Sequence, residues 1–263
     1  MNEVNEVIRQ LRERTSVRIF EDRDVPEPIK NEVIAAAFEA PSAGNMMFYT
    51  IIDVTDQKVK DQLSVLCDHQ PFIAKAPWIL LFLADYQRWW DYYHCCQVKK
   101  YCEEKGLAYR PPQEGDMLLA VCDALIAAQT AVLAAESLGI GSCYIGDILE
   151  NYEIHRELLS LPDYVLPITL ICFGYPYKSA LSLRKTPRFA REFILFKNRY
   201  KLLDDETLPR MFQPLEDQHA REGWSLDGVR NIGQNNYQQK FIADFSIEMN
   251  RSVKAMLNNW KKK

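Results

Sequence analysis

The stretch from Asp116 to Ile148 constrains the fold most, because it contains a long helix that is apolar on most of its sides. From Met117 to Leu138 it consists of strong helix formers without Gly or Pro. When the residues are placed around a helix at about 100° per residue, its five polar residues gather on one side. At about 1.5 Å per residue, the helix would span about 33 Å. Because so widely apolar a helix is buried, we expect the chain to wrap around it. Gly139 is the expected stop, and a short strand ending near Gly146 follows.

A membrane-spanning helix is the alternative interpretation of this stretch. Asp123 and Glu136 interrupt the apolar run, so no uncharged stretch of about 18 residues remains. We therefore expect a soluble protein without a membrane partner.

Composition limits the class of protein further. With 263 residues and 48% hydrophobic content, the chain can bury a sizeable core as one large domain or a domain with arms. A net charge of −4 argues against a nucleic-acid surface over the whole protein, so no nucleic-acid partner is expected. The N-terminus is charged at once and lacks an apolar signal segment, and the seven cysteines form no CxxC pair. Both features favour a cytoplasmic protein with reduced thiols.

Two apolar runs have the length of interior strands. The run from Trp78 to Ala84 is continuous, which is typical of a strand buried on both faces. The run from Leu166 to Gly174 is similar, but Pro167 weakens its start. Helices are expected at residues 2–14, 26–39, 57–66 and 150–159.

Three polar or small-residue segments are candidates for binding a ligand, each with a plainer alternative. The segment from Arg14 to Arg18 places two guanidiniums and two hydroxyls within five residues, which suits a phosphate or forms an ordinary polar helix end. The small-residue loop 40–45 allows close approach of a ligand or makes a plain turn. The third segment is a solvated loop or a phosphate-facing one. Its basic residues are Lys178, Arg184, Lys185, Arg188 and Arg191.

Familiar catalytic motifs are missing from the sequence. There is no GxSxG, Walker A, HExxH or GxGxxG pattern, which argues against a dinucleotide-binding Rossmann fold. His94, Cys95, Cys96 and Cys102 match no metal-ligand spacing, so no metal site is expected. If the protein is an enzyme, a borrowed cofactor carries the reaction.

Taken together, five stretches resemble the flavin-dependent nitroreductase family. They are Arg14-Thr15-Ser16-Val17-Arg18, Ala40-Pro41-Ser42-Ala43-Gly44-Asn45, Ala76-Pro77 with the strand after it, Asp123 to Gln129, and Ser142 to Ile148. The resemblance implies an α+β fold with a mixed sheet around a long central helix. It also implies an intertwined homodimer with FMN at the subunit interface. We expect an FMN-binding domain at 1–192 and a C-terminal extension with a dimer-embracing helix at 193–263.

The resemblance also implies which residues bind the flavin. Contacts to the ribityl chain and phosphate are expected from Arg14, Thr15, Ser16 and Arg18. The loop that reaches the flavin from the partner subunit is expected at Pro41, Ser42, Ala43 and Asn45. The isoalloxazine ring is expected to meet Gln70 at its edge and the backbone of Tyr144, Ile145, Gly146 and Asp147. One or more of Arg184, Lys185 and Arg188 would hold the phosphate. Where the family loop continues Met-Gln-Pro-Trp, this chain has Met46-Met47-Phe48-Tyr49.

The function implied by the resemblance is an FMN-dependent oxidoreductase working by a ping-pong mechanism. NAD(P)H would supply electrons, and a small electron-poor acceptor such as a nitroaromatic, a quinone or free flavin would take them. No catalytic side chain is expected, because the flavin carries the chemistry. The alternatives are a flavin-binding module for sensing or storage with little turnover, and a reductive dehalogenase on the same fold.

The C-terminal segment carries a regular apolar stripe. Its members recur at steps of three or four residues and are Tyr237, Phe241, Phe245, Met249, Val253, Met256 and Trp260. We expect one long helix that lies across the partner subunit, because so large an apolar stripe needs a surface to cover it.

Overall fold

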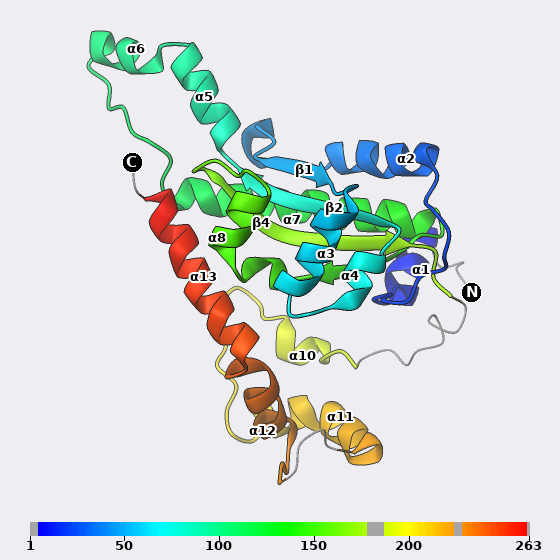
Figure 1. Ribbon diagram of the computed structural model, residues 1–263. Coiled ribbons are helices and arrows are strands. Elements are labelled where there is room, and N and C mark those ends of the chain that lie inside the picture. Colours follow the sequence, from blue (N-terminus) through cyan, green and yellow to red (C-terminus); the bar gives the residue numbers. More distant parts are fainter. Residues whose placement is uncertain (1–4, 178–186, 224–227, 262–263) are drawn as a thin grey trace. The chain divides into compact units, whose positions relative to one another are not determined.

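The computed structural model describes residues 5–177, 187–223 and 228–261 (Figure 1). Contacts divide the chain into two units, one formed by residues 1–182 with 248–263 and the other by residues 183–247. The predicted boundary between an FMN-binding domain at 1–192 and a C-terminal extension at 193–263 stays a prediction.

The first unit combines helices with a four-stranded sheet. Its helices are α1 (Glu6–Glu13), α2 (Glu27–Phe38), α3 (Gln57–Leu66), α4 (Pro71–Lys75), α5 (Gln87–Cys95), α6 (Val98–Lys105), α7 (Glu114–Ser137), α8 (Tyr152–Leu158) and most of α13 (Asp244–Trp260). Short 3-10 turns lie at η1 (Ala43–Asn45) and η2 (Asp147–Leu149). The predicted α+β fold with a long central helix is confirmed.

The sheet has the strand order β1-β2-β4-β3. Its strands are β1 (Tyr49–Asp53), β2 (Trp78–Asp85), β3 (Gly141–Ile145) and β4 (Val165–Gly174). All three pairs of strands are antiparallel, and among the described residues the one parallel pairing is the isolated bridge between Ser16 and Ser142. The predicted mixed character of the sheet is therefore limited to that bridge. Pro167, which lacks a backbone N–H, pairs with Leu83 where the register of β2 and β4 shifts.

Helices cover both faces of the sheet. Figure 1 shows α7 behind the sheet and α3 and α4 in front of it. On the α7 side, Trp78, Leu80 and Phe82 of β2 pack with buried residues of α2 and α7. On the other side, Ile79 and Leu81 pack with residues of α3 and α4. All eight residues of β2 are buried, which confirms the prediction of an interior strand.

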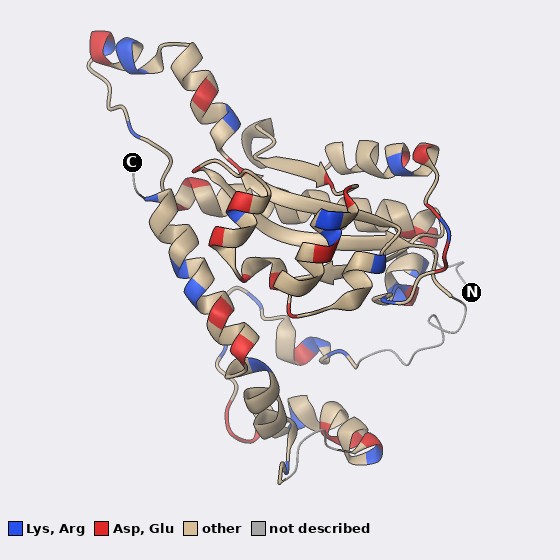
Figure 2. Cartoon of the chain, in the orientation of Figure 1, with Lys and Arg blue, Asp and Glu red and all other residues tan. Residues whose placement is uncertain are grey.

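Helix α7 is the centre of this unit, as predicted, and Gly139 after it has a φ of 77°, which suits a glycine stop. Its buried residues are Met117, Ala120, Asp123, Ala124, Ala127, Ala128, Ala131, Val132 and Ala135. The small alanines let the helix lie close to the sheet. In Figure 2 this helix and the strands are free of charge along most of their length.

One side of α7 is exposed in the single chain, so the predicted burial is only partial within one subunit. Its large exposed residues include Leu118, Leu119, Leu125 and Ile126, which are 40–60% exposed. The reason is that the sheet and α2 cover the helix from one side only. In the described part of the chain, α7 alone is long and apolar enough to cross a membrane by length and composition. Its burial against the sheet is that of a core helix.

The C-terminal stripe does not form the single predicted helix. Residues Tyr237–Phe241 form a π-helical turn, and α13 begins only at Asp244. A step of four residues advances about 400° around an α-helix, so each step drifts by about 40° and the stripe cannot keep one face. Met256 and Trp260 are buried against Tyr164 of their own unit, and Trp260 Nε1 donates to Gln113 O at 3.1 Å.

The second unit is helical in its described parts. It contains α10 (Arg191–Ile194), α11 (Thr207–Glu222), α12 (Ile232–Asn236) and the π-helical turn. The Ile232 backbone N donates to Glu216 Oε1 at 2.9 Å, and the rings of Phe189 and Phe212 lie edge to face. These contacts join α12 to α11 and the segment before α10 to α11.

Candidate functional site

The cationic segment from Arg14 to Arg18 is fixed against the outer edge of β3. The Val17 N–H donates to Ser142 O at 2.9 Å, and Val17 itself is buried. A Cβ at Gly141 would lie 2.8 Å from Val17 Cγ2, so only glycine allows this close approach. Anchoring Val17 holds the predicted anion-binding segment, which includes Arg14 and Arg18, at the edge of β3.

Charged groups converge on this edge. Arg14 lies near Glu136 of α7, whose pKa burial raises to about 7 although the guanidinium opposes the rise. Burial also raises the pKa of Cys143 in β3, an effect that Arg18 and Arg14 partly offset. Glu136 Oε1 and Ser142 Oγ are buried without a hydrogen-bond partner.

Gln70 and Asp147 meet at the end of β3. Gln70 precedes α4, and its Nε2 donates to Asp147 Oδ2 at 2.7 Å and to Cys67 O at 2.9 Å. Asp147 opens the 3-10 turn that follows β3. The structure thus joins two predicted flavin residues that lie 77 positions apart in the sequence. We call Arg14–Arg18, Gln70 and Tyr144–Asp147 the β3 half-site.

The small-residue loop is held by a buried carboxylate of the central helix. Asp123 is 2% exposed, and its two oxygens accept from the backbone N–H of Ala43 at 2.9 Å and of Phe48 at 3.1 Å. Trp89 of α5 donates from Nε1 to Met46 O at 2.7 Å. Gly44 at φ 58° supplies a left-handed turn inside the loop. We call the loop from Pro41 to Asn45 the β1 half-site.

The two half-sites lie at opposite edges of the sheet in one chain. The loop leads into β1, whereas the cationic segment and Tyr144 belong to the β3 edge, and β2 and β4 lie between them. At about 4.8 Å per strand, the outer strands are about 14 Å apart. One chain therefore does not bring all the predicted flavin residues together.

Of the three predicted phosphate-binding residues after β4, Arg188 alone lies within the described residues. Arg184 and Lys185 lie outside the described residues. Arg188 is exposed and belongs to the second unit. Its predicted phosphate contact stays a prediction.

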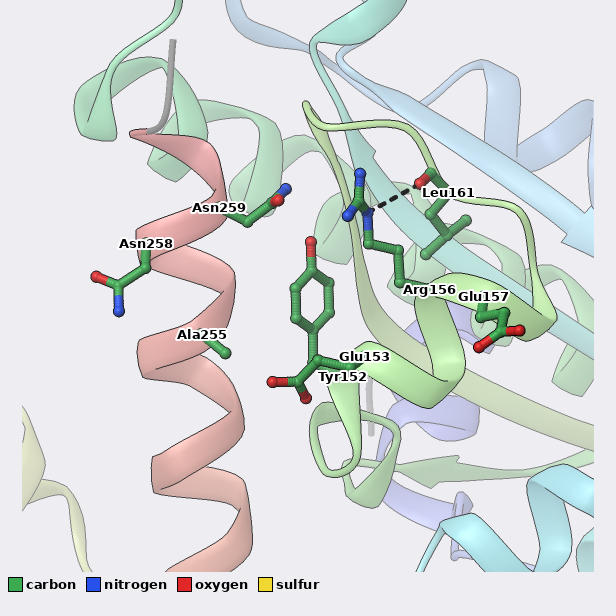
Figure 3. A pocket seen from close by; sticks show the side chains of 8 residues that line it. All are labelled: Tyr152, Glu153, Arg156, Glu157, Leu161, Ala255, Asn258 and Asn259. Carbon is green, nitrogen blue, oxygen red and sulfur yellow. Dashed lines mark hydrogen bonds between the residues drawn. The ribbon is translucent and has the colours of Figure 1, made fainter.

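A cavity of about 570 Å³ lies between α8 and α13, away from both half-sites (Figure 3). Its floor includes Tyr152, and Arg156 at its side donates from Nε to Leu161 O at 3.2 Å and pairs with Asp163 at 2.6 Å. None of the predicted flavin residues lines it. The cavity is thus separate from the predicted flavin site.

Sequence reasoning missed two carboxyl groups next to the half-sites. Asp123 was read as an interruption of an apolar run and as the start of one family-like stretch, and neither reading assigned it a contact. A lone carboxylate in a buried helix needs hydrogen-bond donors and so signals a tethered backbone. Glu150, which is 5% exposed, gave no signal because two of its three acidic neighbours, Asp68 and Glu248, are distant in sequence.

Comparisons with known proteins agree with the sequence resemblance. The profile of the Nitroreductase family matches residues 11–175. An oxygen-insensitive NADPH nitroreductase of Salmonella typhimurium is 33% identical over 208 residues, covering 79% of this chain and 80% of the relative. An FMN reductase [NAD(P)H] of Bacillus subtilis is 34% identical over 215 residues, covering 82% of each chain. The structure of the hypothetical oxidoreductase YcnD from Bacillus subtilis has a TM-score of 0.75 at 29% identity, covering 96% of this chain and 98% of that one.

Proposed function

Because the chain belongs to the nitroreductase family, we propose that it is an NAD(P)H-dependent oxidoreductase that binds FMN and reduces a small electron-poor acceptor. The relatives named above are an NADPH nitroreductase and an FMN reductase, so both the cofactor and the electron donor have support in the family. The acceptor would be a nitroaromatic, a quinone or a free flavin.

The observation that carries the proposal is the fit of the β3 half-site to a flavin phosphate and ring. Arg14 and Arg18 offer two guanidiniums for a phosphate at the edge of β3. Gly141 permits the close packing that fixes these donors. At the other end of β3, the amide of Gln70 and the carboxylate of Asp147 supply polar groups for the ring edge.

When bound, FMN supplies the electron chemistry by taking a hydride from NAD(P)H and giving electrons to the acceptor. The residues of the chain would bind the flavin and orient it. The anchored segment around Val17 fixes the guanidiniums, and the Gln70–Asp147 hydrogen bond fixes the ring edge of the half-site. Rigid positioning of this kind would lower the entropic cost of bringing the two substrates in turn to the same face of the flavin ring.

A homodimer would complete the site. The β1 and β3 half-sites lie at opposite edges of the sheet, so the loop of one subunit would have to meet the β3 edge of the other. The exposed leucines of α7 give such a dimer an apolar surface to bury. The seven free cysteines fit the cytoplasm, which we include in the proposal.

The bound cofactor tests this proposal. The purified protein should be yellow, and heat should release FMN in preference to FAD, identified by chromatography. Sedimentation should give the mass of two chains. A colourless protein that also fails to bind added FMN would end the flavin proposal.

A further inference from the structure

The cavity between α8 and α13 contains a buried hydroxyl group that the chain itself leaves unpaired. Tyr152 is 2% exposed, and among the described residues its Oη has no hydrogen-bond partner. Figure 3 shows this hydroxyl pointing into the space between the two helices, toward Asn259 and Arg156. An unpaired polar group in a buried place costs stability unless water or a ligand satisfies it. The orphaned hydroxyl therefore indicates a place where a ligand binds.

The cavity is preformed and of the size that small molecules occupy. Ala255 of α13 directs only a methyl group toward Tyr152, and buried Leu161 adds a second apolar wall (Figure 3). The two helices are fixed beside each other, since the Tyr152 N–H donates to Ser252 Oγ at 3.0 Å. The volume of about 570 Å³ lies within the roughly 300–1,000 Å³ that is typical of ligand sites.

Two further polar groups converge on the same space. Arg156 uses Nε and Nη2 for Leu161 O and Asp163, which leaves the N–H groups of its Nη1 for a ligand. Asn259 donates from Nδ2 to Asp163 O at 3.1 Å, which leaves its Oδ1 as an acceptor. Burial raises the pKa of Tyr152, and the nearby guanidinium and amide partly offset the rise. The cavity thus presents two donors, from Arg156 and the neutral phenol, and one acceptor, from Asn259.

The charges around the cavity favour an uncharged ligand. Asp163 pairs with Arg156 at 2.6 Å and balances its positive charge. Glu153 and Glu157 also line the cavity and add negative charge, which disfavours an anion. A cation would meet the guanidinium of Arg156 at the centre of the site.

We propose that this cavity binds an uncharged heterocycle through an imide edge, in which an N–H lies between two carbonyl groups. The carbonyl oxygens would accept from Arg156 Nη1 and Tyr152 Oη, and the N–H would donate to Asn259 Oδ1. Uracil and thymine rings carry this edge, and so does the pyrimidine ring of a free flavin. The inference goes beyond the proposed function, because the cavity is separate from both half-sites.

Titration calorimetry with uridine tests the site in the full-length protein as purified, after gel filtration has removed free flavin. A Kd of about 1 mM or tighter is expected for a heterocycle of this size. In 3-methyluridine a methyl group replaces the imide hydrogen, so this compound should bind at least about tenfold more weakly. Riboflavin is titrated in parallel. Binding of uridine alone would assign the site to pyrimidines, and binding of riboflavin alone would assign it to flavins.

Two substitutions place the binding in the cavity. Ala255→Leu fills the space beside Tyr152 and should abolish binding of whichever compound the wild type takes. Lys254→Leu is the matched control, because Lys254 is the exposed neighbour in the same helix and does not line the cavity. It should bind like the wild type. Tyr152→Phe removes only the hydroxyl and should weaken binding by about threefold to tenfold. Thermal melting followed by circular dichroism checks that each variant is folded.

Three results would overturn the inference. The first is a wild-type protein that binds neither uridine nor riboflavin. The second is undiminished binding in folded Ala255→Leu and in Tyr152→Phe, which would place the ligand elsewhere. The third is equal affinity for uridine and 3-methyluridine, since the imide hydrogen would then make no contact.

Discussion

Replacing Asp123 tests how the central helix holds the β1 half-site. In Asp123→Ala, the backbone N–H groups of Ala43 and Phe48 lose their carboxylate acceptor in a buried environment. Hydrogen bonds to a charged group contribute about 1.5–3 kcal/mol each, so the free energy of unfolding should fall by about 3–6 kcal/mol. This is a large part of the roughly 5–15 kcal/mol that stabilises a typical domain.

Urea unfolding, followed by circular dichroism at fixed protein concentration with and without saturating FMN, measures this loss. Asp123→Asn retains one acceptor oxygen and should lose about half as much. Asp116→Ala is the control, because Asp116 is a carboxylate of the same helix that caps its first turn without contacting the loop. The control loses its capping bond and its ion pair with Arg110, should cost about 1–2 kcal/mol, and should leave FMN affinity unchanged.

If the loop contributes to the flavin site, Asp123→Ala should also weaken FMN binding while Asp116→Ala does not. A variant that unfolds within about 0.5 kcal/mol of the wild type, the range of ordinary surface substitutions, would refute the tethering role.

Three further predictions concern the flavin segment, the buried carboxyl group and the C-terminal helix. Arg18→Ala should weaken FMN binding by about 1.5–3 kcal/mol, measured by titration calorimetry, and unchanged affinity would make Arg18 a bystander. Glu150 holds its proton up to a pKa of about 7 when folded but only to about 4.3 when unfolded, so its contribution to stability is complete at low pH and is lost as pH rises to 7. The free energy of unfolding of Glu150→Gln relative to wild type should therefore rise by about 3 kcal/mol between pH 4 and pH 8, and a constant difference would contradict the shifted pKa. Trp260→Ala should lower the free energy of unfolding by about 3–5 kcal/mol, measured in urea, because Trp260 is buried. As a control, Ile247→Ala at an exposed position of the same helix should change it by no more than about 0.5 kcal/mol. Equal losses in the two variants would contradict the observed packing.

Elements with a strong local pattern were predictable from sequence. The continuous apolar run at Trp78 is typical of a buried strand, and the Gly- and Pro-free stretch before Gly139 is typical of a long helix; the structure has both. Proline punctuation also placed the end of α2 before Pro41. In each case the information lies within about 20 neighbouring residues.

Features that depend on tertiary placement were not predictable. The strand order sets β1 and β3 at opposite edges, and no local pattern records that order. Of the three acidic neighbours of Glu150, Asp147 is close in the chain but Asp68 and Glu248 come from distant segments, so the residues around Glu150 in the sequence do not record its full surroundings. The apolar stripe of the C-terminus indicated burial, but only the structure shows that Trp260 packs on its own unit.

Anaerobic mixing of the purified protein with NADPH tests the central proposal most directly. The flavin absorbance should bleach in a single turnover, and a quinone or nitroaromatic added afterwards should restore it, since the ping-pong order separates the two steps. A bound flavin that neither NADPH nor NADH bleaches would contradict the proposed oxidoreductase.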